Sequence, residues 1–320
     1  MTDMSPQNRD LMTRQLDNLE KSTKLEHSRH RWGIVFKSLG ALYLALVTIG
    51  VGTAYWDKMP PSSGHIAVVR LNGPIAEDQP ASAGKINAGL RAAFEENEAK
   101  AVVIAINSPG GSPVQSSYIY NEIMRLKTLH EKPVYAVISD IGASGAYYVA
   151  SAADEIFANE SSLVGSIGVT AAGFGFTGLI EKIGVERRQF TSGEHKTFLD
   201  PFAPVKEDEA EFWNGVLGDV HQNFINAVER GRGDKLKNTP DLYSGLIWNG
   251  SQAIELGLID GLGSVRSISR EKHDIEEFWD YTHEEPFAKL KDILGASLGQ
   301  GLTHVISPDR EGARLSMQYH

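Results

Sequence analysis

Apolar runs alternate with amphipathic segments along most of this chain, at the spacing of repeated strand and helix units. Residues 101–107 are almost continuously apolar, which is typical of a strand covered on both faces inside a parallel sheet. Before that run, Ile86, Leu90 and Phe94 recur at helical spacing. This alternation predicts an α/β fold in which helices cover a mostly parallel sheet.

The same criteria place the other elements along the chain. We predict strands over residues 66–71, 101–107, 133–139, 155–158, 164–169 and 185–190. We predict helices over residues 84–98, 114–130, 146–153, 179–183, 206–231 and 265–281. Residues 246–262 are expected to form a strand, a capped helix and a glycine-terminated turn that close the domain.

One face of the long helix predicted over residues 206–231 is apolar. Its stripe consists of Phe212, Val216, Val220, Phe224 and Val228. Acidic residues at positions 207–209 suit the positive end of the helix dipole. We interpret the stripe as a contact with the core or with another subunit rather than as part of a catalytic site.

An apolar segment over residues 32–56 is long enough to cross a bilayer. It carries Lys37 as its only charge before Trp56 and contains about 20 apolar or small residues. Basic residues are more frequent before the segment than after it, so the positive-inside rule places the N-terminus in the cytoplasm. A cleaved signal peptide and a buried core helix are the alternatives, although the long polar leader speaks against a signal peptide.

These features divide the chain into five parts. A cytoplasmic leader over residues 1–31 and a transmembrane anchor over residues 32–56 precede a linker over residues 57–64. The main folded domain is expected over residues 65–265, and a helical extension with a tail over residues 266–320. The predicted location is the inner (cytoplasmic) membrane, as a single-pass protein whose main domain is periplasmic or extracellular.

The composition excludes several classes of function. A formal net charge of -10 argues against nucleic acid as a partner. The chain has no cysteine, which excludes thiol catalysis, disulfides and cysteine-bound zinc. Histidines are present, but none belongs to a His-Glu-x-x-His zinc pattern. We therefore expect no metal and no cofactor.

A serine lies where the strand of residues 133–139 is expected to turn into the helix of residues 146–153. Ser144 is flanked on both sides by small residues, namely Gly142, Ala143, Gly145 and Ala146. These residues would let a substrate backbone approach the hydroxyl, and the helix start would direct its free N–H groups to the same place. The pattern fits a nucleophile that needs a base, and the alternative is tight packing with Ser144 as an N-cap.

Two other segments carry weaker signals. Among the histidines only His195, beside Lys196, remains a candidate base, because no histidine has a persuasive carboxylate context. Residues 173–178 match the glycine pattern of a dinucleotide site, but they contain the bulky Phe174 and lead only into a short helix. We interpret them as a strand or loop that flanks a substrate groove.

Four motifs occur in order and carry a family resemblance. They are Ser-Pro-Gly-Gly at 108–111, Ala-Ser-Gly-Ala-Tyr-Tyr-Val-Ala-Ser-Ala-Ala-Asp at 143–154, Val-Gly-Ser-Ile-Gly-Val at 164–169, and Ser-Gly-x-x-Lys with the following Asp-Pro-Phe at 192–202. Over residues 65–265 the chain resembles the bacterial signal peptide peptidase A family, in its short single-module form. This resemblance implies a serine–lysine peptidase on a Clp/crotonase-like fold, which is a spiral of βαβ units.

The resemblance also implies roles for five residues. Ser144 would be the nucleophile, and Lys196 would be the general base. Because an amine accepts a proton only when neutral, Lys196 needs a poorly solvated pocket, and the alternative is an ordinary surface lysine. Ser166 would orient the amine, while the backbone N–H of Gly111, joined by that of Gly145, would bind the oxyanion.

We predict a membrane-anchored serine endopeptidase that acts through an acyl-enzyme. The resemblance implies remnant signal peptides and other short membrane-proximal peptides as substrates, the lipid bilayer as a partner, and a homo-oligomer whose neighbouring subunits can share the dyad. His195 stands where the family often has an aromatic residue. This difference bears on which substrates are preferred rather than on the presence of the dyad. The alternatives are a non-catalytic membrane scaffold and a crotonase-type acyl-CoA enzyme, which an external location disfavours.

Overall fold

The computed structural model describes residue 21, residues 36–46, residue 48, residues 60–237 and residues 239–283. The chain forms two compact units, Met1–Pro60 and Pro61–His320. In the first unit, residues 36–46 are helical and exposed. The predicted leader and much of the predicted anchor lie outside the described residues, as does the tail after residue 283. Among the described residues, no helix combines the length and the apolar character needed to cross a bilayer.

The described part of the second unit is built on an eight-stranded sheet. Its strands are β1 (His65–Asn72), β2 (Ala99–Ser108), β3 (Val134–Ala143), β4 (Glu155–Ala158), β5 (Leu163–Gly165), β6 (Ile247–Asn249), β7 (Gly261–Leu262) and β8 (Phe278–Asp280). Its helices are α2 (Ala83–Glu95), α3 (Pro113–His130), α4 (Gly145–Ala150), α5 (Thr177–Lys182), α6 (Glu207–Arg232), α7 (Gly250–Glu255) and α8 (Val265–His273).

The strand order confirms the predicted mostly parallel sheet. The main path runs β6-β5-β3-β2-β1-β8, and β4 pairs with both β3 and β7. Among these pairs only β5 and β6 are antiparallel. Because β2, β3 and β5 are parallel neighbours, the loops that follow them leave the sheet at the same edge.

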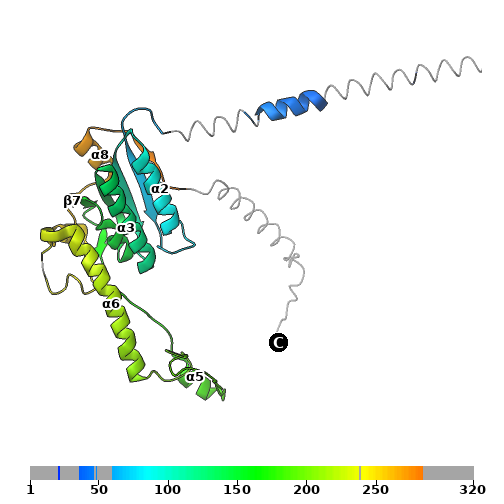
Figure 1. Cartoon of the computed structure of the whole chain (residues 1–320), viewed down its shortest axis with the longest axis vertical. Coiled ribbons are helices and arrows are strands. Elements are labelled where there is room, and N and C mark those ends of the chain that lie inside the picture. Colours follow the sequence, from blue (N-terminus) through cyan, green and yellow to red (C-terminus); the bar gives the residue numbers. More distant parts are fainter. Residues whose placement is uncertain (1–20, 22–35, 47, 49–59, 238, 284–320) are drawn as a thin grey trace, which may run out of the picture. The chain divides into compact units, whose positions relative to one another are not determined.

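Alternate residues of the central strands pack on opposite faces of the sheet, as the two-residue period of a strand requires. Val69 and Leu71 of β1 belong to a large core that also includes residues of α2, α3, α4 and α6. Ile66 and Val68 belong to a smaller core with Ile268 of α8. Figure 1 shows α2 and α3 side by side against the sheet. Each face thus has its own helical cover, which explains the continuous apolar runs.

Three predicted elements differ from the structure. Residues 185–190 form no strand, since no neighbouring strand pairs with them, and Phe190 is 92% exposed. The strand predicted over residues 164–169 ends at Gly165, because Ser166 takes a positive φ of 50°. The helix predicted over residues 265–281 ends at His273, where a left-handed residue follows, and the chain then forms β8 beside β1.

Helix α6 packs on the core mainly through its C-terminal part. Phe224 and Val228 of the predicted apolar stripe are buried, whereas Phe212 is 66% exposed. The ring of Phe224 lies 5.0 Å from that of Tyr148 on α4, measured between centroids. The rest of α6 and the segment with α5 form an extension that we call the arm, residues 170–218 (Figure 1). The predicted apolar stripe of α6 therefore packs in the core only at its C-terminal end.

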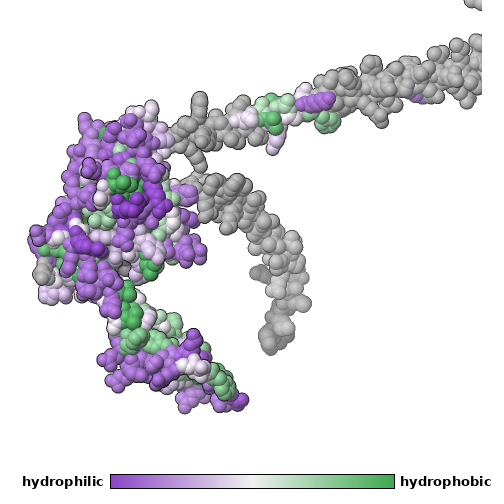
Figure 2. Space-filling model, in the orientation of Figure 1, coloured by the Kyte–Doolittle hydropathy of each residue, from purple (hydrophilic) through white to green (hydrophobic). Residues whose placement is uncertain are grey.

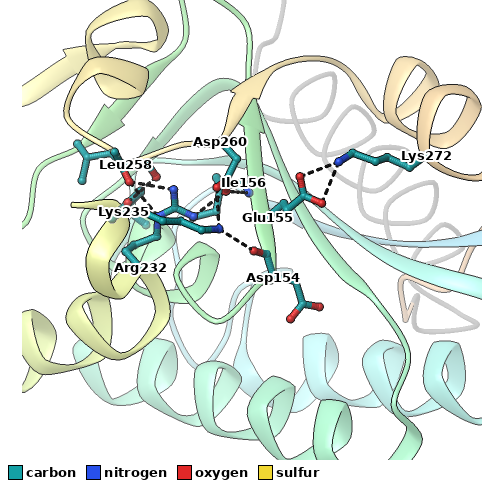
Figure 3. Close-up of polar contacts among 10 residues, drawn as sticks. Asp154, Glu155, Ile156, Arg232, Lys235, Leu258, Asp260 and Lys272 are labelled. Carbon is teal, nitrogen blue, oxygen red and sulfur yellow. Dashed lines mark hydrogen bonds and ion pairs between the residues drawn. The ribbon is translucent and has the colours of Figure 1, made fainter. Parts of the chain in front are cut away.

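A buried ion-pair network fixes the base of α6. The fully buried guanidinium of Arg232 donates to Asp260 Oδ2 at 2.6 Å and to the Gly257 carbonyl (Figure 3). Asp260 also accepts hydrogen bonds from Lys235 Nζ and from the Ile156 N–H, each at 2.7 Å. Burial acts to raise the pKa of Asp260, but the hydrogen bonds from Arg232 and Lys235 outweigh it and hold that pKa below its ordinary value.

Asp260→Asn is expected to destabilise the protein by about 3 kcal/mol at neutral pH, because it leaves the buried Arg232 charge unpaired. Since folding lowers the pKa of Asp260, its ionic stabilisation is present above the ordinary aspartate pKa and is lost as pH falls through the folded value. Urea unfolding at several pH values should therefore show the two proteins converging in acid.

The matched control for this prediction is Glu186→Gln, which breaks an exposed pair with Arg188. This change should alter the free energy of unfolding by less than about 0.5 kcal/mol. If the difference between wild type and Asp260→Asn stays constant down to acid pH, ionised Asp260 is not what stabilises the base of α6.

Candidate active site

Ser144 lies at the sharp junction between β3 and α4. Its backbone has φ 52° and ψ -127°, a combination that costs a non-glycine residue about 1–3 kcal/mol. Its N–H donates to the Gly165 carbonyl at 2.8 Å, and its carbonyl accepts from the Tyr148 N–H at 3.0 Å. The hydroxyl caps no N–H of α4, so the interpretation of this side chain as an N-cap is wrong. The turn instead presents a half-buried hydroxyl where β3 ends.

The loop that follows β2 brings backbone N–H groups next to Ser144. Gly111 forms a parallel bridge with Ile75, and the hydrogen bonds of this bridge come from the residues on either side of the glycine. The N–H of Gly111 therefore points away from Ile75. A Cβ on Gly110 would lie 2.8 Å from the Ser144 Cβ, and a Cβ on Gly145 would lie 3.2 Å from the Gly111 nitrogen. The loop thus packs directly against the start of α4.

The N–H groups of Gly111 and Gly145 form a candidate oxyanion site. Gly145 is the first residue of α4, so its N–H has no partner within the helix. Both positions exclude a side chain, because a Cβ on Gly111 would lie 2.2 Å from the Ile75 carbonyl oxygen and one on Gly145 would lie 2.4 Å from Ser116 Oγ. Glycine at these two positions therefore lets the loop pack against Ile75 and the start of α4 pack against Ser116.

The Ser144 hydroxyl and the two glycines lie in the wall of one open cavity of about 480 Å³. Gly111, Ser144, Gly145 and Ser166 all line it. The remaining lining residues are mostly small or apolar: Pro113, Tyr148, Gly168, Val169, Thr170, Val220, Phe224, Ser244 and Gly245. No imidazole, carboxylate or amine from the described part of the chain belongs to this lining. The cavity therefore presents the Ser144 hydroxyl beside backbone N–H groups, and none of its described lining residues could serve as a base.

Ser166 enters the cavity from the turn that follows β5. Its backbone has φ 50°, and its N–H donates to the Leu246 carbonyl at 2.8 Å. From the other side, His221 Nε2 on α6 lies 3.2 Å from the Ile167 carbonyl oxygen. Neither His221 nor the cavity residues before β6 stand out in the sequence, because only the folded chain brings these segments beside the serine motifs.

Lys196 does not line this cavity. It lies in the arm between α5 and α6, its side chain is exposed, and its loop contacts Glu209 in the first turn of α6. About 22 Å of helix separates Glu209 from Phe224, which does line the cavity. Figure 1 shows α5 at the end of α6 that is remote from the sheet. Lys196 and Ser144 of one chain therefore lie on the order of 20 Å apart.

The arm itself is largely exposed. His195 and the glycine-rich residues 173–178 both lie in it, away from the cavity lining, and the latter lead into α5. Figure 2 shows apolar patches on this extension. Its most exposed apolar side chains are Phe174, Ile183, Phe190, Val205 and Phe212. Within the described residues, no group of histidine, aspartate and glutamate side chains could hold a metal ion.

Comparisons with known proteins place this arrangement in a family. Residues 127–277 match peptidase family S49. The chain is 48% identical over 213 residues to the Na(+)/H(+) antiporter NhaA of Brucella abortus, a match that covers 65% of this chain and 29% of that protein. It is 33% identical over 236 residues to the chloroplastic serine protease SPPA of Arabidopsis thaliana, covering 71% of this chain and 35% of that protein.

A third relative is matched over most of its length. It is a Synechocystis sp. protein whose name describes it as a putative protease, and it is 34% identical over 212 residues, which cover 65% of this chain and 73% of that protein. The chain thus spans less than half of the first two relatives but about three quarters of the third. On this evidence the chain belongs to peptidase family S49, the signal peptide peptidase A family.

Proposed function

We propose that this protein is a serine endopeptidase that hydrolyses peptide bonds through an acyl-enzyme on Ser144. The strained Ser144 turn carries the proposal, because its hydroxyl makes no cap bond and faces an open cavity beside the N–H groups of Gly111 and Gly145. A strained backbone persists only where the surrounding structure enforces it, and such residues gather at active sites. Membership of family S49 supports the same activity.

The base in this proposal is Lys196 of a neighbouring chain. The cavity around Ser144 has no base of its own among the described residues, and Lys196 of the same chain lies in the exposed arm. The arm carries apolar side chains such as Phe174 and Phe190, 82% and 92% exposed, which a second copy would cover. A head-to-tail contact between arm and cavity closes into a ring and removes water from the amine.

Each group then has one chemical task. The neutral amine of Lys196 takes the proton from Ser144 Oγ as the oxygen attacks the peptide carbonyl, and later gives it to the leaving amine. The N–H groups of Gly111 and Gly145 stabilise the oxyanion, and the hydroxyl of Ser166 orients the lysine amine. Water then gives a proton to the same lysine as it attacks the acyl carbonyl, the bond from that carbon to Ser144 Oγ breaks, and the lysine returns the proton to Oγ as the product leaves.

The proposed setting is the membrane. We assign residues 32–56 as a single-pass anchor of the inner membrane, with the N-terminus in the cytoplasm and the catalytic domain in the periplasm or outside the cell. The described parallel sheet is compatible with a Clp/crotonase-like spiral. An open cavity suits an extended peptide, so the proposed substrates are remnant signal peptides and other short or unfolded peptides near the membrane.

Cleavage of a quenched fluorescent peptide with a signal-peptide sequence tests the activity. Wild type should cleave it, whereas Ser144→Ala and Lys196→Ala should each lower kcat by at least about a thousandfold, since the nucleophile or its base is removed. Equal cleavage by all three proteins would refute the dyad. Absence of cleavage by a folded, assembled wild type would favour the non-catalytic scaffold instead.

Co-expression of the two inactive variants tests the shared site. If serine and lysine come from different chains, random mixing of Ser144→Ala with Lys196→Ala chains restores about a quarter of the sites, because one interface in four pairs both intact residues. Mixed assemblies that stay as inactive as the single variants would show that one chain supplies both residues.

A further inference from the structure

Two buried carboxylates hold the loop that carries Lys196. The side chains of Glu209 and Asp200 are each only 5% exposed, although most of the arm around them is exposed. Charged side chains are rarely buried unless they have partners that stabilise them. Both of these carboxylates find those partners in the arm itself, within or next to the segment that contains Lys196.

Glu209 contacts the chain on both sides of Lys196. Its Oε2 accepts a hydrogen bond from the Leu199 N–H at 3.4 Å, and its Oε1 lies 3.9 Å from His195 Nδ1. The same carboxylate accepts from Lys206 Nζ at 2.9 Å. That bond, with the Leu199 N–H, holds the pKa of Glu209 below its ordinary value, so the carboxylate is ionised at neutral pH.

Asp200 secures the far end of the same loop. Arg187 Nε lies 2.8 Å from its Oδ2, and the Phe202 N–H donates to its Oδ1 at 3.0 Å. The Arg187 guanidinium also lies over the Phe202 ring, 5.1 Å from its centroid. Lys196 therefore belongs to a segment that the two carboxylates hold mainly on its C-terminal side, while its own side chain stays exposed.

A helix-stabilising role does not account for these contacts. Glu207 and Asp208 occupy the same first turn of α6, are exposed, and already supply negative charge to the helix start. The N-cap residue Lys206 has no side-chain cap bond, and Glu209 bonds the preceding loop rather than the N-cap backbone. Besides its pair with Lys206, Glu209 thus differs from Glu207 and Asp208 in that it also contacts the lysine loop.

We propose that Glu209 is a positioning residue that fixes the Lys196 loop, so that the amine reaches the serine of the adjoining chain in a productive geometry. The inference rests on the proposed role of Lys196 as the base. Lysine has a long flexible side chain, and the backbone-to-backbone hydrogen bonds donated by its loop are local turns, such as Lys196 N–H to the Gly193 carbonyl. External contacts are therefore needed to hold it within the tolerance that catalysis requires.

The mixed assembly of Ser144→Ala and Lys196→Ala chains allows Glu209 to be changed only in the chain that supplies the lysine or only in the chain that supplies the serine. Glu209→Gln is placed first on the Ser144→Ala chain, which supplies the lysine, and then on the Lys196→Ala chain, which supplies the serine. Only the first placement should lower the restored kcat, by at least about tenfold with KM changed less than about twofold, because it displaces the base without altering the cavity. Asp208→Asn on either chain is the matched control and should leave the restored activity unchanged.

Other outcomes overturn the inference. Equal losses from both placements would indicate a folding or assembly defect, which thermal unfolding and size-exclusion chromatography of the same mixtures would also register. No loss from either placement would show that Glu209 does not position the lysine. If the mixture of Ser144→Ala and Lys196→Ala chains without the Glu209 change is itself inactive, the shared dyad fails, and positioning toward an adjoining chain is refuted with it. Glu209→Gln in the wild-type chain then shows whether Glu209 acts on the lysine within one chain: an unchanged kcat refutes any positioning role.

Discussion

Replacing Gly111 by alanine is expected to lower kcat by about a hundredfold or more, which is the usual consequence of losing an oxyanion donor. The backbone at this residue has φ +149°, and an added Cβ would lie 2.2 Å from the Ile75 carbonyl oxygen. Neither backbone can yield alone, because the parallel bridge ties the two segments together. The loop must therefore move, and the Gly111 N–H moves with it away from Ser144.

Gly84→Ala on α2 is the matched control for this prediction. Gly84 is an exposed helical glycine, and a Cβ there would meet no atom within 4 Å. This change should leave kcat as it is and raise the helix stability by up to about 1 kcal/mol. If Gly111→Ala kept wild-type kcat and KM in the peptide assay, the Gly111 N–H could not be an oxyanion donor.

Short-range patterns predicted the sheet well, whereas the grouping of Gly111, Ser144 and Ser166 was implied only by the family resemblance. The apolar runs located β1, β2, β3 and β4 closely because each is buried on both faces, where side-chain type has little freedom. Gly111, Ser144 and Ser166 then lie in one cavity because each follows the end of one of the parallel neighbours β2, β3 and β5.

Segments whose conformation depends on distant partners were not predictable in this way. Phe278 and Trp279 continue a charged helical pattern in sequence, but Asp274 ends α8 and β1 provides an edge for them to pair with. Residues 185–190 have strand-like composition but no partner strand, so they form no strand and are exposed on the arm. Local propensity cannot specify a partner that is far away in the chain.

The separation of Lys196 from Ser144 has the same origin. Both residues belong to motifs that are recognisable in the sequence. The distance between them, however, depends on the length of α6 and on which of its turns contact the core. The buried Glu209 was likewise indistinguishable from Glu207 and Asp208 in the sequence, because all three suit the first turn of a helix. Only the contacts of the folded arm separate them.

Replacing Gly231 by alanine is expected to destabilise the protein by about 2 kcal/mol and to lower peptidase activity. Gly231 lies in the last turn of α6, and an added Cβ would lie 1.8 Å from the Ser151 carbonyl oxygen at the end of α4. The helices must separate to admit the methyl group, which outweighs the helix-propensity gain of about 1 kcal/mol. Because α4 begins beside Ser144 and α6 contributes Val220 and Phe224 to the cavity, the same displacement should deform the cavity around Ser144.

Gly215→Ala, on the same helix, is the control that separates the effect of the added methyl group on packing from its effect on helix propensity. A Cβ at Gly215 would meet no atom within 4 Å, so this change should stabilise the protein by up to about 1 kcal/mol. If urea unfolding shows that Gly231→Ala lowers the free energy of unfolding and Gly215→Ala raises it, close backbone contact at Gly231 holds α6 on the core. If both substitutions stabilised the protein, α6 and α4 could not be in close contact at Ser151, and the arm would have to be held at its base by the Arg232–Asp260 pair instead.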